Sequence, residues 1–304
     1  MQFSRTLLLG SAVLAVAACS SDPVSKVVTP DPSASIRWVN AIPDTVGMDY
    51  RVVDYPSNAS EPNLLFGTSS GNWRIIPAGS HHVQAFFSCP ASLTAAVGNP
   101  CQVPSVVSTV IDDATFNLEA GKKYTILHYG FAKAGATPAK KLMLIEDVPP
   151  TVPAGQVAIR VINAAAAYGS MNVYSSLSPD TTGVASGTPA FANLAAGAVS
   201  AWVNFPVASG SNSYRLIATS TSSTTSLTKF LAPVGVVATP ATVTTGALDA
   251  VPGARIAGSA FTIVIFGPKV AYTLSASIGG GPVAGSATGA ATTLLDTWPA
   301  RISP

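Results

Sequence analysis

An internal repeat constrains this chain most, because two copies of one sequence must form two copies of one structural unit. IRWVNAIPDTVGMDY begins at Ile36, and the similar IRVINAAAAYGSMNV begins at Ile159, an offset of 123 residues (159 − 36). The same offset carries Asn40 to Asn163. A chain of 304 residues is long enough for two domains. The sequence therefore predicts a duplicated module.

Three later blocks recur in the same order at other offsets. PAGSHHVQAFF (77–87) parallels LAAGAVSAWVNF (194–205), EAGKKYTILHYG (119–130) parallels IAGSAFTIVIFG (256–267), and KLMLIEDVPP (141–150) more weakly resembles TLLDTWPA (293–300). The preserved order indicates that the whole module was duplicated and that insertions separate the blocks.

The repeated blocks have the patterns of β-strands. IRWVNA and YTILHYG alternate their side chains with period 2, and Gly and Pro recur at short intervals between the blocks. Beyond the first 19 residues no long stretch keeps a helical period. We expect an all-β protein with two tandem immunoglobulin-like (Greek-key) β-sandwich domains of about seven strands each, over residues 35–150 and 151–304.

One spacing supports this fold class in the first copy. Leu118, Gly121 and Tyr124 have the L-x-x-G-x-x-Y pattern of a tyrosine corner, in which the Tyr hydroxyl bonds to the chain a few residues earlier. The second copy has Phe261, which cannot make that bond, although Gly258 keeps the turn.

The N-terminal segment has the organisation of an export signal. One cation, Arg5, precedes an apolar run of 13 residues (6–18), which is shorter than the roughly 20 residues of a membrane span. The sequence VAAC, ending at Cys19, resembles the bacterial lipobox. That resemblance implies a signal peptide over residues 1–18, lipidation of Cys19, and the outer membrane as destination because Ser20 follows. An ordinary signal peptide is the alternative, and residues 19–34, rich in Pro and Ser, read as a flexible tether.

The two remaining cysteines, Cys89 and Cys101, enclose a short loop. An exported chain meets an oxidising compartment, so we expect them to form a disulfide. Two free thiols are the alternative. A zinc site is disfavoured because no second ligand pair lies nearby.

The residues described so far resemble the domain-of-unknown-function family 4397. The I-R-x-x-N-A opening, the Met-Asp/Asn element and the L-x-A-G-x-x-Y-T strand carry the resemblance, which extends over nearly all of residues 35–304. It implies an exported bacterial lipoprotein with tandem copies. It supplies no catalytic residue to transfer.

The histidines give little indication of chemistry. His81 and His82 are neighbours in a predicted strand and point to opposite faces, so they cannot easily share a metal. His128 aligns with Ile265, which indicates a packing position. No nucleophile elbow, zinc-protease helix or P-loop occurs in the sequence.

Three aspartates, Asp44, Asp49 and Asp54, invite a calcium interpretation, because that ion prefers several oxygen ligands. The second copy has Ala, Asn and Leu at the matching positions, so we favour a turn role for Asp44 and a backbone hydrogen bond for Asp49. We expect no metal and no cofactor.

The tryptophans leave a binding role open. Trp38 and Trp202 lie within predicted strands and are expected in the core, whereas Trp73 and Trp298 lie near turns and are possible ligand contacts. Only 10% of residues are charged and the net charge is +2, which argues against a nucleic-acid partner.

Together these features predict a non-enzymatic, surface-anchored lipoprotein of the cell envelope, with two modules for binding, adhesion or envelope structure. Its expected partners are the membrane, through the lipid anchor, and an unidentified protein or glycan. A carbohydrate-binding envelope module is the alternative, and an envelope hydrolase is the third possibility.

Overall fold

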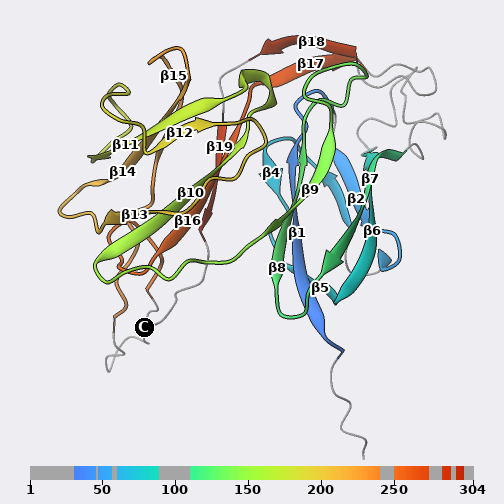
Figure 1. The fold of residues 1–304 in the computed structure, drawn as a ribbon, viewed down its shortest axis with the longest axis horizontal. Helices are drawn as coiled ribbons and strands as arrows, with labels where there is room; N and C mark the ends of the chain where they lie inside the picture. The colour runs from blue at the N-terminus through green and yellow to red at the C-terminus, as the bar shows by residue number, and fades with distance from the viewer. Residues whose placement is uncertain are drawn as a thin grey trace, which may run out of the picture. The chain divides into compact units, whose positions relative to one another are not determined.

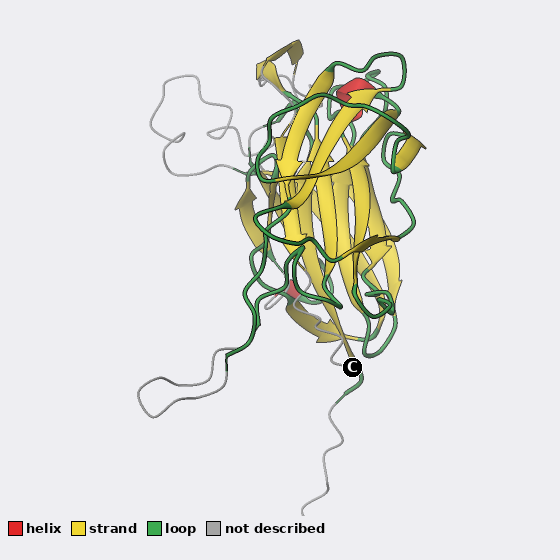
Figure 2. Cartoon of the chain, turned by 90° about the vertical axis from the view of Figure 1, so that its left-hand side faces the viewer, coloured by secondary structure: helices red, strands yellow, loops and turns green. Residues whose placement is uncertain are grey.

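The computed structural model describes residues 31–45, 47–56, 60–88, 110–239, 250–273, 283–288 and 292–297. Strands predominate throughout these residues, and helical segments are short (Figure 2). The predicted all-β, sandwich-like fold is therefore confirmed. Residues 32–304 form one compact unit.

The first half consists of two sheets (Figure 1). One sheet has the order β4-β1-β8-β9, with β5 also paired to β1, and the other has the order β3-β2-β6-β7. The strands are β1 (Ser33–Ala41), β2 (Met48–Val52), β3 (Glu61–Leu64), β4 (Thr68–Ser69), β5 (Arg74–Pro77), β6 (Gly79–Phe87), β7 (Val110–Leu118), β8 (Lys123–Tyr129) and β9 (Lys141–Glu146).

The second half repeats this plan with the sheets β13-β10-β16-β19 and β12-β11-β14-β15, and adds a β17-β18 hairpin. A 3-10 turn, η2 (Ala166–Tyr168), follows its first strand. The strands are β10 (Gln156–Ala164), β11 (Met171–Ser178), β12 (Phe191–Leu194), β13 (Val203–Pro206), β14 (Ser213–Ser220), β15 (Ser226–Leu231), β16 (Ala260–Phe266), β17 (Lys269–Thr273), β18 (Val283–Thr288) and β19 (Thr292–Thr297).

A central parallel strand pair is common to both halves. Strand β1 runs parallel to β8 with Ile36 opposite Tyr124, and β10 runs parallel to β16 with Ile159 opposite Phe261. The two registers are therefore equivalent, because the repeat aligns Ile36 with Ile159 and Tyr124 with Phe261. The expected immunoglobulin-like plan of antiparallel hairpins did not include a parallel pair at the centre of a sheet.

One predicted match between the copies is wrong. Residues 194–205 correspond to 64–76 and not to 77–87, because the Gly67 N–H donates to the Asn40 carbonyl and the Gly197 N–H donates to the Asn163 carbonyl. Strand β6 corresponds instead to β14, since both pair with the second strand of their half. The short Ala-Gly turn motif misled the alignment because similar turns occur at two places in each copy.

Three groups of buried apolar side chains hold the unit together. The first lies inside the first sandwich, where Trp38 stacks on Tyr50 at 5.0 Å between ring centroids, and the second lies inside the second sandwich. The third joins the halves through outward-facing residues of the central strands, including Val39 and Tyr129 from one half and Ile162 and Phe266 from the other. The sheet containing β1 is thus covered on both faces, as parallel strands require.

Candidate functional site

Two arginines at the same position of the repeat are buried in the central sheets. Strand pairing places Arg37 beside Thr125 and Arg160 beside Thr262. In each half the arginine Nε donates to the threonine Oγ1 at 2.8 Å. Each guanidinium is thereby held in one orientation on the outer face of its central sheet.

The carboxylate of Asp147, which follows β9, forms ion pairs with both arginines. Arg160 Nη2 donates to Asp147 Oδ1 at 2.5 Å, Arg37 Nη2 lies 3.5 Å from Oδ2, and the Thr125 hydroxyl donates to Oδ2 at 2.5 Å. The carboxylate is fully buried, and the arginine side chains are 10% and 6% exposed. One anion therefore links the two sandwiches.

Opposing effects act on the pKa of the Asp147 carboxyl. Burial raises the pKa of its carboxyl above the ordinary value, whereas Arg37, Thr125 and Arg160 act to lower it. Since Thr125 Oγ1 accepts from Arg37 and so turns its own proton toward Asp147, the geometry fits an ionised carboxylate.

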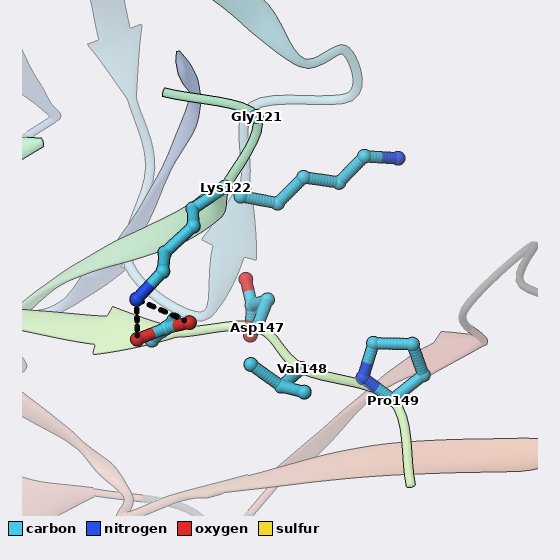
Figure 3. Close-up of a pocket in the computed structure, with 7 residues that line it drawn as sticks. Gly121, Lys122, Asp147, Val148 and Pro149 are labelled. Atoms are coloured by element: carbon cyan, nitrogen blue, oxygen red, sulfur yellow. Dashed lines mark hydrogen bonds and ion pairs between the residues drawn. The ribbon is translucent and has the colours of Figure 1, made fainter. Parts of the chain in front are cut away.

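A cavity of about 290 Å³ lies beside this cluster, lined by residues 121–123 and 146–149. The Lys122 ammonium lies 3.2 Å from the Glu146 carboxylate, and Figure 3 marks this ion pair with dashed lines. Glu119 also pairs with Lys122, at 2.9 Å, and these two carboxylates raise the pKa of Lys122. Lys122 and Glu146 are thus paired with each other at this cavity.

The tryptophans cover the same arginines. The Cζ of Arg37 lies 4.6 Å from the Trp73 ring centroid, and the Cζ of Arg160 lies 4.9 Å from that of Trp202. Trp202, which we expected in the core, is only half-buried, because it immediately precedes β13, a strand at a sheet edge, and its ring packs on the arginine. Trp38 is fully buried as expected.

Of the two tryptophans considered as ligand contacts, Trp73 is half-buried and also carries the Lys123 ammonium 5.5 Å from its ring centroid. Two cations therefore lie over the ring of Trp73. Trp298 lies outside the described residues, as do Cys19, Cys89 and Cys101.

The residues of the expected tyrosine corner lie at the turn between β7 and β8. The Glu119 N–H donates to the Tyr124 Oη at 3.1 Å, while Leu118 is buried and Gly121 has a positive φ of 78°. In the second half the corresponding N–H, that of Ile256, donates to the Gly253 carbonyl at 2.9 Å. The turn with Phe261 is thus completed without a hydroxyl.

His81 and His82 have separate partners on opposite faces of β6. His81 Nδ1 lies 2.7 Å from Asp54 Oδ2 and its Nε2 lies 2.8 Å from the Pro77 carbonyl oxygen. His82 Nε2 lies 3.2 Å from Asp113 Oδ2 at the surface.

A buried polar chain through the first sandwich was not anticipated from the sequence. His128 is completely buried, with Nδ1 3.1 Å from the Tyr50 hydroxyl and Nε2 3.5 Å from Asp112 Oδ2. Burial lowers the pKa of His128, and the nearby Asp112 opposes this. The only sequence signal was the exchange of His128 for Ile265 in the second copy, which indicated a core position but not its polar neighbours.

The aspartates considered for calcium instead accept backbone hydrogen bonds. Asp44 is buried and accepts from the Ala132 and Lys133 N–H groups, and Asp49 accepts from Asn63. Asp54 accepts from the N–H of His82. In the described part of the chain, no three His, Cys, Asp or Glu side chains are grouped as a metal site would require.

Two further observations concern identity. The described residues include no helix long and apolar enough to cross a membrane. Residues 34–174 match the family described as a domain of unknown function, DUF4397, a range that covers the first half together with β10 and the first half of β11. No curated protein matches the chain.

Proposed function

Since residues 34–174 belong to the DUF4397 family, whose description names no activity, we propose that the protein is a non-enzymatic lipoprotein of the cell envelope. Cys19 carries the lipid, residues 20–32 connect it to the body, and the two sandwiches act as one rigid element for binding, adhesion or envelope structure. The outer membrane is the proposed location.

The observation that carries this proposal is the use of the repeated polar residues. Asn40 donates to the Leu64 carbonyl and accepts from the Ile42 N–H, and Asn163 makes the equivalent bonds to Leu194 and Ala165. Both asparagines are completely buried. Buried polar groups need such partners, so their presence in both copies is explained by folding alone.

Other repeated polar positions behave in the same way. The hydroxyls of Ser70 and Ser200 accept from the first central strand of their half, and Asp49 and Asn172 each accept from a backbone N–H at 2.8 Å. The shared arginines are used to join the halves. The polar groups common to both copies therefore support a scaffold better than a reaction.

The alternative of a carbohydrate-binding module has less support. A sugar platform needs an aromatic face open to solvent, and Arg37 and Lys123 lie over the ring of Trp73.

Replacement of Cys19 tests the proposal. In a bacterial host that processes lipoproteins, the wild-type chain should sediment with membranes, and the Cys19→Ser variant should appear in the soluble periplasmic or culture fraction. A Cys89→Ser/Cys101→Ser variant serves as the control, because it also replaces cysteine with serine but should remain membrane-bound. Membrane retention of the Cys19→Ser variant would contradict the proposal.

A further inference from the structure

Four exposed valines gather on one projection of the second half. Val234, Val236, Val237 and Val251 are 39%, 51%, 69% and 53% exposed. We call these four residues the valine platform. Valine prefers to be buried, so a group of exposed valines on one segment marks a surface that contacts something apolar.

The base of the valine platform is firmly built. Val236 and Val251 exchange two backbone hydrogen bonds, at 3.0 and 2.9 Å, and the Ala254 N–H donates to the Pro233 carbonyl at 2.8 Å. Gly235 has a positive φ of 83°, and a Cβ added at Gly253 would lie 2.0 Å from the Gly235 nitrogen. The two glycines therefore allow close backbone contact, and the valines project from a defined scaffold.

The central strands of the two halves run in the same direction where the halves meet. Toward the starts of β1 and β10, Arg37 and Arg160 share one carboxylate. Toward the strand ends, Phe66 contacts Phe266 with 5.8 Å between ring centroids, and a Cβ added at Gly197 would lie 3.0 Å from the Tyr129 ring. The starts of β1 and β10 consequently lie at the same end of the two-sandwich body.

The valine platform lies at this same end. The Gly258 N–H donates to the carbonyl of Gln156, the first residue of β10, and the Ala208 N–H donates to Ala254 at the base of the platform. In the first half, Ile75 pairs with Ser35 near the start of β1 and is 65% exposed. Apolar surface from both halves is thus found where the chain enters the body.

The length of the tether sets how far this end can be from the lipid. Pro32 lies thirteen positions after Cys19 (32 − 19), and at most about 3.5 Å per position gives a reach of about 45 Å. A lipid attached to Cys19 would therefore keep the start of β1 within about 45 Å of the bilayer. The described residues 232–239 and 250–256 contain a single charged residue, Arg255, so this surface carries little charge that would have to be desolvated at an apolar interface.

We propose that the valine platform rests in the interfacial region of the lipid bilayer and orients the body with this end toward the membrane. The inference depends on the lipid anchor of the proposed function. The lipid would hold the protein at the membrane, and the four valines would restrict its orientation, because a second apolar contact strengthens a single anchor.

An environment-sensitive fluorophore tests this placement in the full lipidated chain. A single cysteine replaces Val237 in a Cys89→Ser/Cys101→Ser background, carries the NBD fluorophore, and is reconstituted into vesicles of phosphatidylethanolamine and phosphatidylglycerol. The matched control places the same label at Leu65, which is 55% exposed and belongs to the loop at the far ends of β1 and β8. Emission at position 237 should shift to shorter wavelength and be quenched by spin-labelled lipid, while position 65 should remain water-like.

The outcomes separate the two proposals. Failure of the chain to float with the vesicles would overturn the lipid anchor and, with it, this inference. Flotation with both labels in a water-like environment would overturn the platform alone. A shift at position 237 that disappears on dilution with excess lipid would assign the valines to contacts between copies and would also overturn it.

Discussion

The substitution Asp147→Asn removes the carboxylate charge with which the side chains of both Arg37 and Arg160 are paired, while it keeps the size of the side chain. The carboxylate is completely buried, and the two guanidinium groups are nearly so. Breaking a buried ion pair by removing one partner typically costs about 3–5 kcal/mol, because the remaining charge stays desolvated. The amide retains one acceptor, so we expect a loss near the lower limit, about 3 kcal/mol in the free energy of unfolding.

Urea unfolding at pH 7, followed by tryptophan fluorescence, measures this loss. Asp113→Asn is the matched control, because that carboxylate is 62% exposed and pairs with His82 at the surface. We expect the control to change the free energy of unfolding by no more than about 0.5 kcal/mol. Equal stabilities of the two variants would refute the assignment of Asp147 as the link between the halves.

Two further predictions concern His128 and Tyr124, polar residues of the first half that the second half replaces with apolar ones. Burial lowers the pKa of His128, so its contribution to stability is complete above about pH 6.5 and is lost as the pH falls through the lowered value. A Tyr50→Phe/His128→Ile variant should show a flatter dependence of the urea midpoint between pH 6.5 and 4, and an unchanged slope would contradict this. Tyr124→Phe removes the acceptor of the Glu119 N–H and should cost about 1 kcal/mol in the same assay, whereas Phe261→Tyr should give no gain, since the matching N–H already has a partner.

The repeat made much of the architecture predictable. Strand periodicity and the repeated openings correctly gave an all-β chain with two similar halves, since side-chain alternation is set locally by the backbone. The parallel pairing of β1 with β8 was not predictable in this way, because it joins residues such as Ile36 and Tyr124 that are 88 positions apart (124 − 36). Local patterns do not specify which distant strand completes a sheet.

The charged cluster was missed for a related reason. Arg37 and Arg160 aligned in the repeat, but nothing in the sequence indicated that both would meet Asp147, which comes from a third segment. The roles of Asp49 and Asn172 were easier to foresee, because a side chain at a strand start commonly bonds nearby backbone.

The third apolar core has a consequence for how such copies can be combined. It is formed by matching faces of the two halves, Val39 and Tyr129 against Ile162 and Phe266, and the contact buries these residues on both sides. An interface of like with like closes after two members and cannot continue into a filament. A gene encoding one copy alone would produce a subunit with this face bare, and such a subunit should self-associate as a pair. Longer arrays would then be expected to contain even numbers of copies.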